Sequence, residues 1–98
     1  PPRKSGQRKR FLEEDADRQH TLVLFESPHR TAATLADALE VLGDRRAAVC
    51  IELTKKFEEV RRGYLSELAA AFATEKIRGE VTVVIAGNHP KFTAGQDS

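Results

Sequence analysis

The sequence is poor in sulfur, with a single cysteine, Cys50, and no methionine. A lone cysteine excludes an internal disulfide and is typical of a reducing compartment, so we expect a cytoplasmic protein. Because Cys50 lies in the apolar run 47–51, we interpret it as a small buried hydrophobic residue. The chain begins Pro-Pro and has no start methionine, and we therefore expect it to be part of a longer protein.

Several familiar functional signatures are also missing. No apolar run approaches the ~20 residues that a helix needs to span a bilayer, and no signal-peptide pattern is present. The sequence has no glycine-rich phosphate loop, no Gly-x-Ser-x-Gly elbow and no zinc-ligand spacing. The three histidines are scattered. We therefore expect no metal site and no membrane contact.

Basic residues are concentrated at the start of the chain. Residues 1–10 hold five of them and no acid, although the net charge of the whole chain is only +1. Such a segment is either a solvated terminus or a contact for phosphates. We divide the chain into a basic arm (1–10), a folded domain (11–87) and a polar tail (88–98). The basic residues of the arm are Arg3, Lys4, Arg8, Lys9 and Arg10.

The order of apolar and polar segments predicts an α/β domain. We expect a layered sheet, mixed or parallel, of about four strands with flanking helices, and short of one strand that would precede Pro1. The predicted helices cover 7–18, 28–42 and 66–76; the predicted strands cover 21–25, 47–53, 59–62 and 81–86. The middle helix has the clearest limits, with Ser27 as N-cap, Pro28 as first residue and Gly43 as stop signal.

Finer features of these elements follow from residue type. The continuous apolar run 21–25 is typical of a strand covered on both faces. The segment 59–62 is a weak edge strand, Gly63 is expected to turn the chain, and Ser66 is expected to cap the last helix. The loop 54–57 and the polar turn 44–46 complete the prediction. The apolar positions expected to face inward from the helices are Phe11, Leu12, Ala16, Ala32, Leu35, Leu39, Leu42, Leu68 and Phe72.

Two predicted strands end in polar clusters. The first leads into Glu-Ser-Pro-His-Arg at 26–30, and the second ends in Glu-Leu-Thr-Lys at 52–55. If the two strands are parallel neighbours, both clusters lie at one edge of the sheet, where open α/β sheets bind ligands. The side chains expected to converge there are Glu26, His29, Arg30, Glu52, Thr54 and Lys55.

The first cluster suits an anion. Arg30 would lie beside the free N–H groups of a helix N-terminus, and both favour a phosphate or carboxylate. His29 could accept a proton near neutral pH. The alternative is structural: Glu26 and Arg30 pair with each other, or with Lys55 and Glu52, and hold the strand ends in register.

In order and spacing, these segments resemble the small-subunit ribosomal RNA (cytidine-2′-O)-methyltransferases of the tetrapyrrole methylase group. The matching segments are Pro2-Arg3-Lys4-Ser5-Gly6, Phe25 with 26–30, Glu52-Leu53-Thr54-Lys55, Glu58-Glu59 with Arg62-Gly63, and Arg78-Gly79-Glu80. The resemblance covers residues 1–87 and is to the C-terminal domain alone. The chain departs from the pattern at Ile51, where the family usually has arginine.

The resemblance implies two α/β domains with S-adenosylmethionine bound in the cleft between them, usually in a homodimer. This chain would then form one wall of the cleft, pack against its own N-terminal domain, and be inactive alone. The residues implied to bind the cofactor are Glu52, Leu53, Thr54, Ala86 and Gly87. Those implied to bind the ribosomal RNA are Ser27, Arg30, Lys55, Arg3, Lys4, Arg8, Lys9 and Arg10.

The implied reaction transfers a methyl group to a ribose 2′-hydroxyl. The hydroxyl must lie in line with the sulfonium methyl, and a group or water must accept its proton. Glu26 and His29 are the candidate acceptors. Two alternatives stay open: an RNA-binding or dimerisation module without catalysis, and another methyltransferase of the same group. The six aromatic residues, mostly in the predicted core, count against an RNA-binding module.

Overall fold

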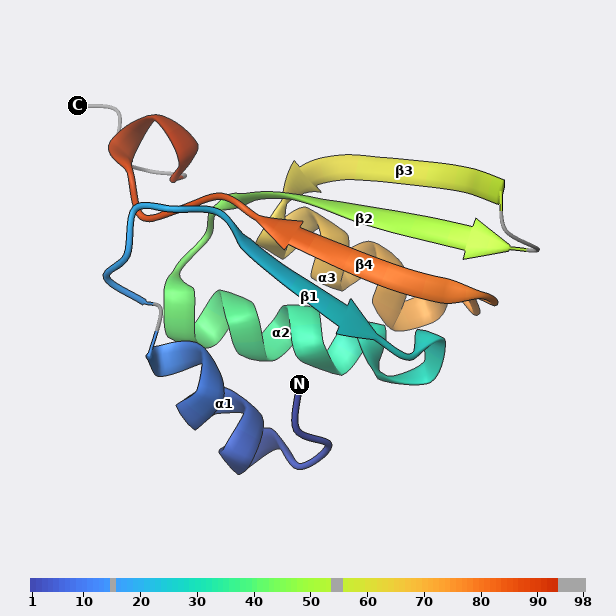
Figure 1. Ribbon diagram of the computed structural model, residues 1–98, viewed down its shortest axis with the longest axis horizontal. Helices are drawn as coiled ribbons and strands as arrows, with labels where there is room; N and C mark the ends of the chain where they lie inside the picture. Colours follow the sequence, from blue (N-terminus) through green and yellow to red (C-terminus); the bar gives the residue numbers. More distant parts are fainter. Residues whose placement is uncertain (15, 54–55, 94–98) are drawn as a thin grey trace.

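The computed structural model describes residues 1–14, 16–53 and 56–93, and shows a sheet of four strands with helices beside it (Figure 1). The α/β class with flanking helices is confirmed. The elements are α1 (Ser5–Glu13), β1 (Leu22–Glu26), η1 (Pro28–Arg30), α2 (Thr31–Leu42), β2 (Arg46–Leu53), β3 (Lys56–Tyr64), α3 (Leu65–Thr74), β4 (Glu80–Ile85) and η2 (Pro90–Phe92). In the described ranges, no helix is long and apolar enough to cross a membrane.

The strands lie in the order β1-β4-β2-β3, and each neighbouring pair is antiparallel. β1 and β2 therefore run in the same direction, but they are not the parallel neighbours that we expected, because β4 lies between them. β2 and β3 form a hairpin, whereas α2 and α3 each connect two strands across one intervening strand. The sheet thus consists of two interleaved split βαβ units.

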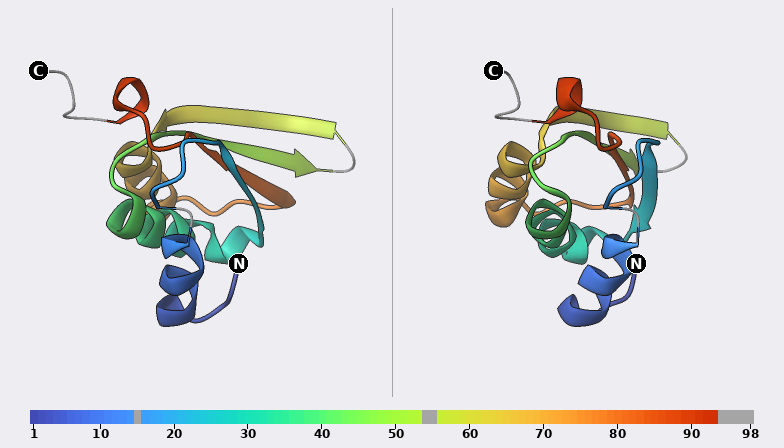
Figure 2. Two further views of the ribbon diagram at one scale, coloured as in Figure 1. Left: turned by 60° about the vertical axis from the view of Figure 1, so that its left-hand side comes forward. Right: turned by 90° about the vertical axis from the view of Figure 1, so that its left-hand side faces the viewer.

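Helices α2 and α3 cover one face of the sheet (Figures 1 and 2). The opposite face, which we call the open face, carries Val23, Phe25, Ala48, Cys50, Arg62, Thr82 and Val84. Val23 is 50% exposed and Phe25 is 76% exposed. The prediction that 21–25 is covered on both faces is therefore wrong. Cys50, which was predicted to be buried, is half-buried.

The core lies between α2, α3 and the inner face of the sheet. Its apolar residues are Leu12, Leu24, Leu35, Ala38, Leu42, Val49, Ile51, Leu65, Leu68, Phe72, Val81, Val83 and Ile85. Leu35 has no exposed surface, and full burial of a leucine contributes about 1.5–3 kcal/mol. The predicted inward positions Leu68 and Phe72 are confirmed, whereas Phe11 is 39% exposed.

The predicted limits of the middle helix are confirmed. Ser27 precedes a 3-10 turn that begins with Pro28, and α2 continues this turn from Thr31. Gly43 ends the helix at a φ of 85°, which L-residues rarely adopt, and its N–H donates to the Leu39 carbonyl at 3.0 Å. The Ser27 hydroxyl, however, makes no capping hydrogen bond.

Three local predictions around α3 need correction. Gly63 lies within β3, which is a longer edge strand than expected, and does not turn the chain. Ser66 does not cap the helix, because its N–H and hydroxyl both donate to the Asp44 carboxylate, at 2.9 and 2.6 Å. The helix start is closed instead by Glu67, whose carboxylate accepts the Tyr64 N–H at 2.8 Å.

The N-terminal segment is folded onto the domain. α1 is shorter than the predicted helix 7–18 and packs against α2, with Leu12 fully buried (Figure 2). Ala16 follows the end of the helix and is half-buried. At the other terminus, Asn88 donates its N–H to the Arg18 carbonyl at 2.8 Å, and Thr93 bridges to Arg45.

Candidate functional site

A hollow of about 530 Å³ opens where β1 and β2 end and β4 begins. We call it the strand-end hollow. Because β1 and β2 run in the same direction, their polar ends meet here in spite of the intervening strand. The lining residues are Pro1, Phe25, Glu26, Ser27, Pro28, Arg30, Glu52, Gly79, Glu80, Val81 and Thr82. Thr54 and Lys55, which the sequence predicts here, lie outside the described residues.

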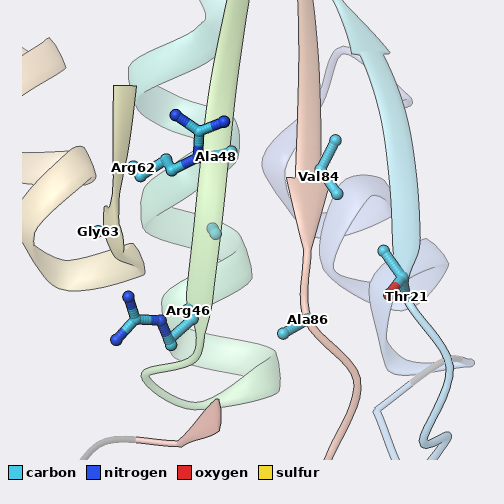
Figure 3. A pocket seen from close by; sticks show the side chains of 8 residues that line it. Thr21, Arg46, Ala48, Arg62, Gly63, Val84 and Ala86 are labelled. Carbon is cyan, nitrogen blue, oxygen red and sulfur yellow. The ribbon is translucent and has the colours of Figure 1, made fainter. Parts of the chain in front are cut away.

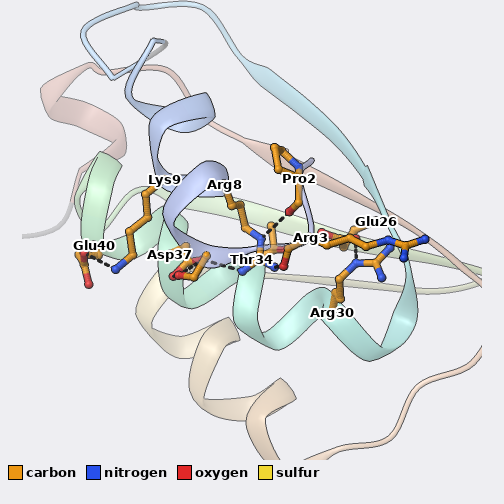
Figure 4. Close-up of polar contacts among 10 residues, drawn as sticks. Pro2, Arg3, Arg8, Lys9, Glu26, Arg30, Thr34, Asp37 and Glu40 are labelled. Carbon is orange, nitrogen blue, oxygen red and sulfur yellow. Dashed lines mark hydrogen bonds and ion pairs between the residues drawn. The ribbon is translucent and has the colours of Figure 1, made fainter.

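Glu26 is the best-bonded residue of this hollow. Its side chain is 1% exposed, since it points from the end of β1 toward the first turns of α2. One carboxylate oxygen accepts the Thr34 hydroxyl at 2.5 Å, and the other accepts the Arg30 Nε–H at 3.2 Å (Figure 4). This second oxygen also accepts the Ser27 N–H at 2.8 Å. Burial disfavours its charge, but these donors outweigh that effect and hold the pKa of Glu26 below its ordinary value.

This network limits what Glu26 can do chemically. Both of its oxygens already accept hydrogen bonds, and a carboxylate with a lowered pKa is a weak base. Its geometry suits the positioning of Arg30 instead. The structural alternative, in which Glu26 and Arg30 pair with each other, is therefore confirmed for this pair.

His29 contacts Arg30 but does not line the strand-end hollow. It is exposed and lines a separate hollow with residues of α3 and the segment after it, among them Phe72 and Lys76. Its Nε2 lies 3.2 Å from Nη1 of Arg30. Arg30, the next residue of the 3-10 turn, lines the strand-end hollow, whereas His29 lines the hollow beside α3.

Ser27 brings an unused hydroxyl to the hollow. Its Oγ is buried and has no hydrogen-bond partner among the described residues. The role expected of it as a helix cap is not filled, because the Ser27 hydroxyl accepts no backbone N–H; only its carbonyl is used, by the Arg30 N–H at 3.1 Å and the Thr31 hydroxyl at 3.0 Å. A buried hydroxyl without a partner is unfavourable, and a bound ligand group that hydrogen-bonds to it would remove this cost.

The opposite wall is acidic. Glu52 of β2 lies directly across from Glu80 of β4. Gly79, the residue before β4, has a φ of 93°. A Cβ at Gly79 would overlap the Glu52 carbonyl oxygen, so glycine is required for this close approach. The sequence alone indicates only a turn at Arg78-Gly79, and the requirement depends on a contact with a distant strand.

Ala86 and Gly87 do not lie near Glu52. Because β4 is antiparallel to β2, its far end lies at the opposite edge, where Ala86 donates its N–H to the Arg46 carbonyl at 2.9 Å. Gly87 is buried, and a Cβ there would overlap the Gln19 carbonyl oxygen. Of the residues implied to bind the cofactor, Glu52 thus lies at one end of β4 and Ala86 and Gly87 lie at the other. The six residues of β4 separate these ends by about 20 Å.

Arg8 of the basic arm has an internal role. It is 3% exposed, and its Nη1 donates to the Asp37 carboxylate at 2.6 Å. Its other guanidinium nitrogens donate to the backbone carbonyls of Pro2 and Arg3, at 3.2 and 2.6 Å (Figure 4). These bonds leave no part of Arg8 for a phosphate. They fold the first residues back, so that Pro1 lines the strand-end hollow.

The other basic residues of the arm are accessible. Lys9 is half-buried and pairs with Glu40 at 2.8 Å, whereas Arg3, Lys4 and Arg10 are exposed. The arm is therefore an ordered, partly helical surface with its cations outside and one anchor inside.

Sequence reasoning missed several buried polar residues, among them Thr34 and Arg45. Thr34, with no exposed surface, holds Glu26; its spacing from Thr31 on the inner side of α2 was the available signal. The sequence places Arg45 in a polar turn, but it is 3% exposed and donates to the carbonyls of Leu42, Ala86 and Ala16. No local pattern distinguishes it from exposed Arg46.

Residues 1–69 match the family model of the tetrapyrrole (corrin/porphyrin) methylases. Among similar proteins, the ribosomal RNA small subunit methyltransferase I of Mycobacterium tuberculosis is 53% identical over 90 residues, which are 91% of this chain and 31% of that protein. Proteins of the same name from Halalkalibacterium halodurans and Bacillus subtilis are each 42% identical, over 90 and 87 residues, which are 92% and 89% of this chain and 31% and 30% of those proteins. The chain spans about a third of the length of the curated relatives it matches.

Proposed function

The chain belongs to the family of tetrapyrrole (corrin/porphyrin) methylases, and from this premise we propose that it is the C-terminal part of a methyltransferase that acts on small-subunit ribosomal RNA. The observation that carries the proposal is the strand-end hollow, where Arg30 and Ser27 face Glu52 across one sheet edge. The relatives' name supplies the substrate class. The finer proposal is that the methyl acceptor is the ribose 2′-hydroxyl of a cytidine.

The proposed methyl donor is S-adenosylmethionine, which supplies an electrophilic methyl group on a sulfonium. The described residues fit part of it. Glu52 can accept hydrogen bonds from ribose hydroxyls or an amine, and Leu53, 39% exposed, can contact an adenine. Gly87 does not fit, since it is pressed against Gln19. The cofactor site therefore needs a second wall, which we assign to an N-terminal domain of the full protein. We also propose that the full protein is a homodimer.

The residues of this chain would act on the RNA through position and charge. Glu26 fixes the Arg30 guanidinium, which is 26% exposed and can hold a phosphate beside the reacting ribose. The free Ser27 hydroxyl can bind the sugar. Of the two candidate proton acceptors, His29 is the one whose ring is exposed, although it lies outside the hollow. A water molecule could serve equally.

Titration calorimetry with S-adenosylmethionine tests the proposal. We expect no tight binding to these 98 residues alone, and clear binding together with methylation of small-subunit ribosomal RNA by the full-length protein. In that protein, Arg30→Ala should lower methylation at least tenfold, because it removes a charged contact to the RNA. The matched control is Arg61→Ala, because the Arg61 side chain is as little exposed as that of Arg30 but pairs with Glu75 and Glu59 away from the hollow. Tight cofactor binding by the isolated chain, or a full-length protein that leaves ribosomal RNA unmethylated, would contradict the proposal.

A dimerisation module is the second candidate. The exposed Val23 and Phe25 on the open face favour it, because neighbouring apolar side chains on a surface are typical of interfaces. Sedimentation of the isolated chain distinguishes the two functions. A stable dimer that Phe25→Ser disrupts, without any methylation by the full-length protein, would support the module.

A further inference from the structure

The open face of the sheet carries a second hollow, at the edge opposite the strand-end hollow. Its volume is about 210 Å³. We call it the arginine hollow, because Arg46 of β2 and Arg62 of β3 flank it, over a floor of Ala48, Val84 and Ala86 (Figure 3). The proposed reaction gives no role to Arg46 or Arg62.

Strand geometry places the two arginines close together. Arg62 lies directly across from Ala48, and Arg46 lies across from Tyr64. Arg46 and Arg62 are therefore diagonal neighbours on one face of an antiparallel pair, a relation that separates the Cα atoms by about 7–8 Å. Two guanidiniums at this spacing can both reach a single phosphate group, which Arg side chains bind through paired hydrogen bonds.

Neither guanidinium is neutralised by the part of the chain that the structure describes. Among the described residues, no carboxylate pairs with Arg46 or Arg62, and both are exposed. Arg46 lies over the Tyr64 ring at 5.5 Å, which orients it without cancelling its charge. Two adjacent cations repel each other, and an anion bound between them removes this repulsion.

The adjacent residue Arg61 shows what a neutralised arginine looks like in the same strand. Strand alternation turns it to the helix side, where it pairs with Glu75 at 2.7 Å and Glu59 at 3.2 Å and lies over the Phe72 ring. These carboxylates, Glu75 above all, raise the pKa of Arg61. Arg61 is committed to the fold, whereas Arg62 is free to bind a ligand.

The rest of the open face favours RNA as the source of the phosphate. The acids Glu52 and Glu80 lie about 20 Å away, the length of six residues of β2, so the basic end stands apart. The floor of the hollow is made of short side chains, which let a phosphate approach. Phe25, 76% exposed on the same face, offers a ring on which a base can stack.

We propose that the arginine hollow binds a backbone phosphate of single-stranded RNA, so that the open face forms a second RNA contact beyond the strand-end hollow. The inference rests on the proposed function for the identity of the nucleic acid. Arg46 and Arg62 contribute to the affinity for RNA and to its position on the protein. They do not select its sequence, since phosphate contacts carry no sequence information.

Fluorescence anisotropy of a labelled 12-nucleotide single-stranded RNA tests the proposal with the 98-residue chain. The double variant Arg46→Gln/Arg62→Gln should bind about tenfold more weakly at low salt. Its slope of log affinity against log salt should fall by about 0.7, because the variant no longer neutralises one phosphate. The control is Arg61→Gln, one residue away on the helix side, which should keep wild-type RNA affinity. Thermal unfolding verifies that the double variant is folded.

Unchanged affinity in the double variant, or an equal loss in Arg61→Gln, would overturn the inference. So would displacement of the RNA by poly-glutamate at the same charge concentration as by unlabelled RNA, because the hollow would then bind any polyanion. Inorganic phosphate should compete only at much higher concentration, because it lacks the stacked base. Cofactor titration and methylation by the full-length protein are separate measurements, so failure of the proposed function would leave the anisotropy result intact.

Discussion

The two hollows lie at opposite edges of one sheet and use arginine in opposite ways. In the strand-end hollow, Arg30 is held by the buried carboxylate of Glu26, which is itself held by Thr34. In the arginine hollow, no described carboxylate holds Arg46 or Arg62. The first arrangement fixes a cation in one orientation, and the second leaves two cations for an external anion.

This difference separates geometry from affinity. A guanidinium oriented by a buried partner can place a substrate, because little of its freedom remains to be lost on binding. Exposed guanidiniums without a partner contribute mostly salt-dependent attraction. Substitutions in the first hollow should therefore change stability and turnover, whereas those in the second should change RNA affinity alone.

The largest effect is expected for Gly79→Ala, which breaks the strand-end hollow. Alanine is strained at a φ of 93°, and its Cβ would overlap the Glu52 carbonyl oxygen. We expect a loss of about 2–4 kcal/mol in the free energy of unfolding. Urea unfolding measures it. The control is Gly6→Ala in α1, where the added Cβ meets nothing within 4 Å. Equal stability of the two variants would show that the close approach of β4 to β2 is unnecessary.

A smaller effect is expected for Glu26→Gln. The neutral amide keeps the shape of the side chain but loses three hydrogen bonds to a charged acceptor, and it leaves buried donors without a good partner. The expected loss at neutral pH is about 2 kcal/mol of unfolding free energy. Glu52→Gln is the matched control, because Glu52 lines the same hollow but is only half-buried. A Glu26→Gln variant as stable as the control would remove Glu26 from its positioning role.

The stability difference between the wild type and Glu26→Gln should depend on pH. The pKa of Glu26 is lowered from its ordinary value of 4.5 in the folded chain. Its contribution to stability is therefore complete above that value and is lost as the pH falls through the lowered pKa. Unfolding curves at pH 7 and near pH 3 should show the wild type and Glu26→Gln converging in acid. A constant difference between them across this range would mean that the Glu26 charge is not what stabilises the fold.

Much of the fold could be predicted because its signals are local. Pro28 begins the 3-10 turn that leads into α2, Gly43 ends the helix, and the ion pair of Glu26 with Arg30 depends on a spacing of four residues. The sequence also predicts that Glu26 and Glu52 lie at one edge of the sheet, and both line the strand-end hollow, although the two strands are not the neighbours that this prediction assumed. It holds because β1 and β2 share a direction, whichever strand lies between them.

The remaining features depend on partners far along the chain. The buried Arg8 and Arg45 look like any surface arginine in the sequence, and their burial is offset by Asp37 and by distant backbone carbonyls. The apolar run 21–25 does not reveal which face is covered, so Phe25 could not be assigned to the surface. The sequence also does not reveal that His29 lines a different hollow from Arg30, because that hollow is formed with residues of α3 far along the chain.

The smallest effect on stability, and the sharpest test of the comparison, is expected for Ala48→Leu. The larger side chain fills the floor of the arginine hollow while leaving Arg46 and Arg62 in place. Because residue 48 faces the open side of the sheet, the free energy of unfolding should change by no more than about 0.5 kcal/mol. RNA affinity should fall several-fold, since the phosphate can no longer lie between the two guanidiniums. Cys50→Val, on the same face of β2 but outside the hollow, is the control for added volume. If Ala48→Leu binds RNA as tightly as Cys50→Val, charge alone explains the attraction, and the hollow has no role in shaping it.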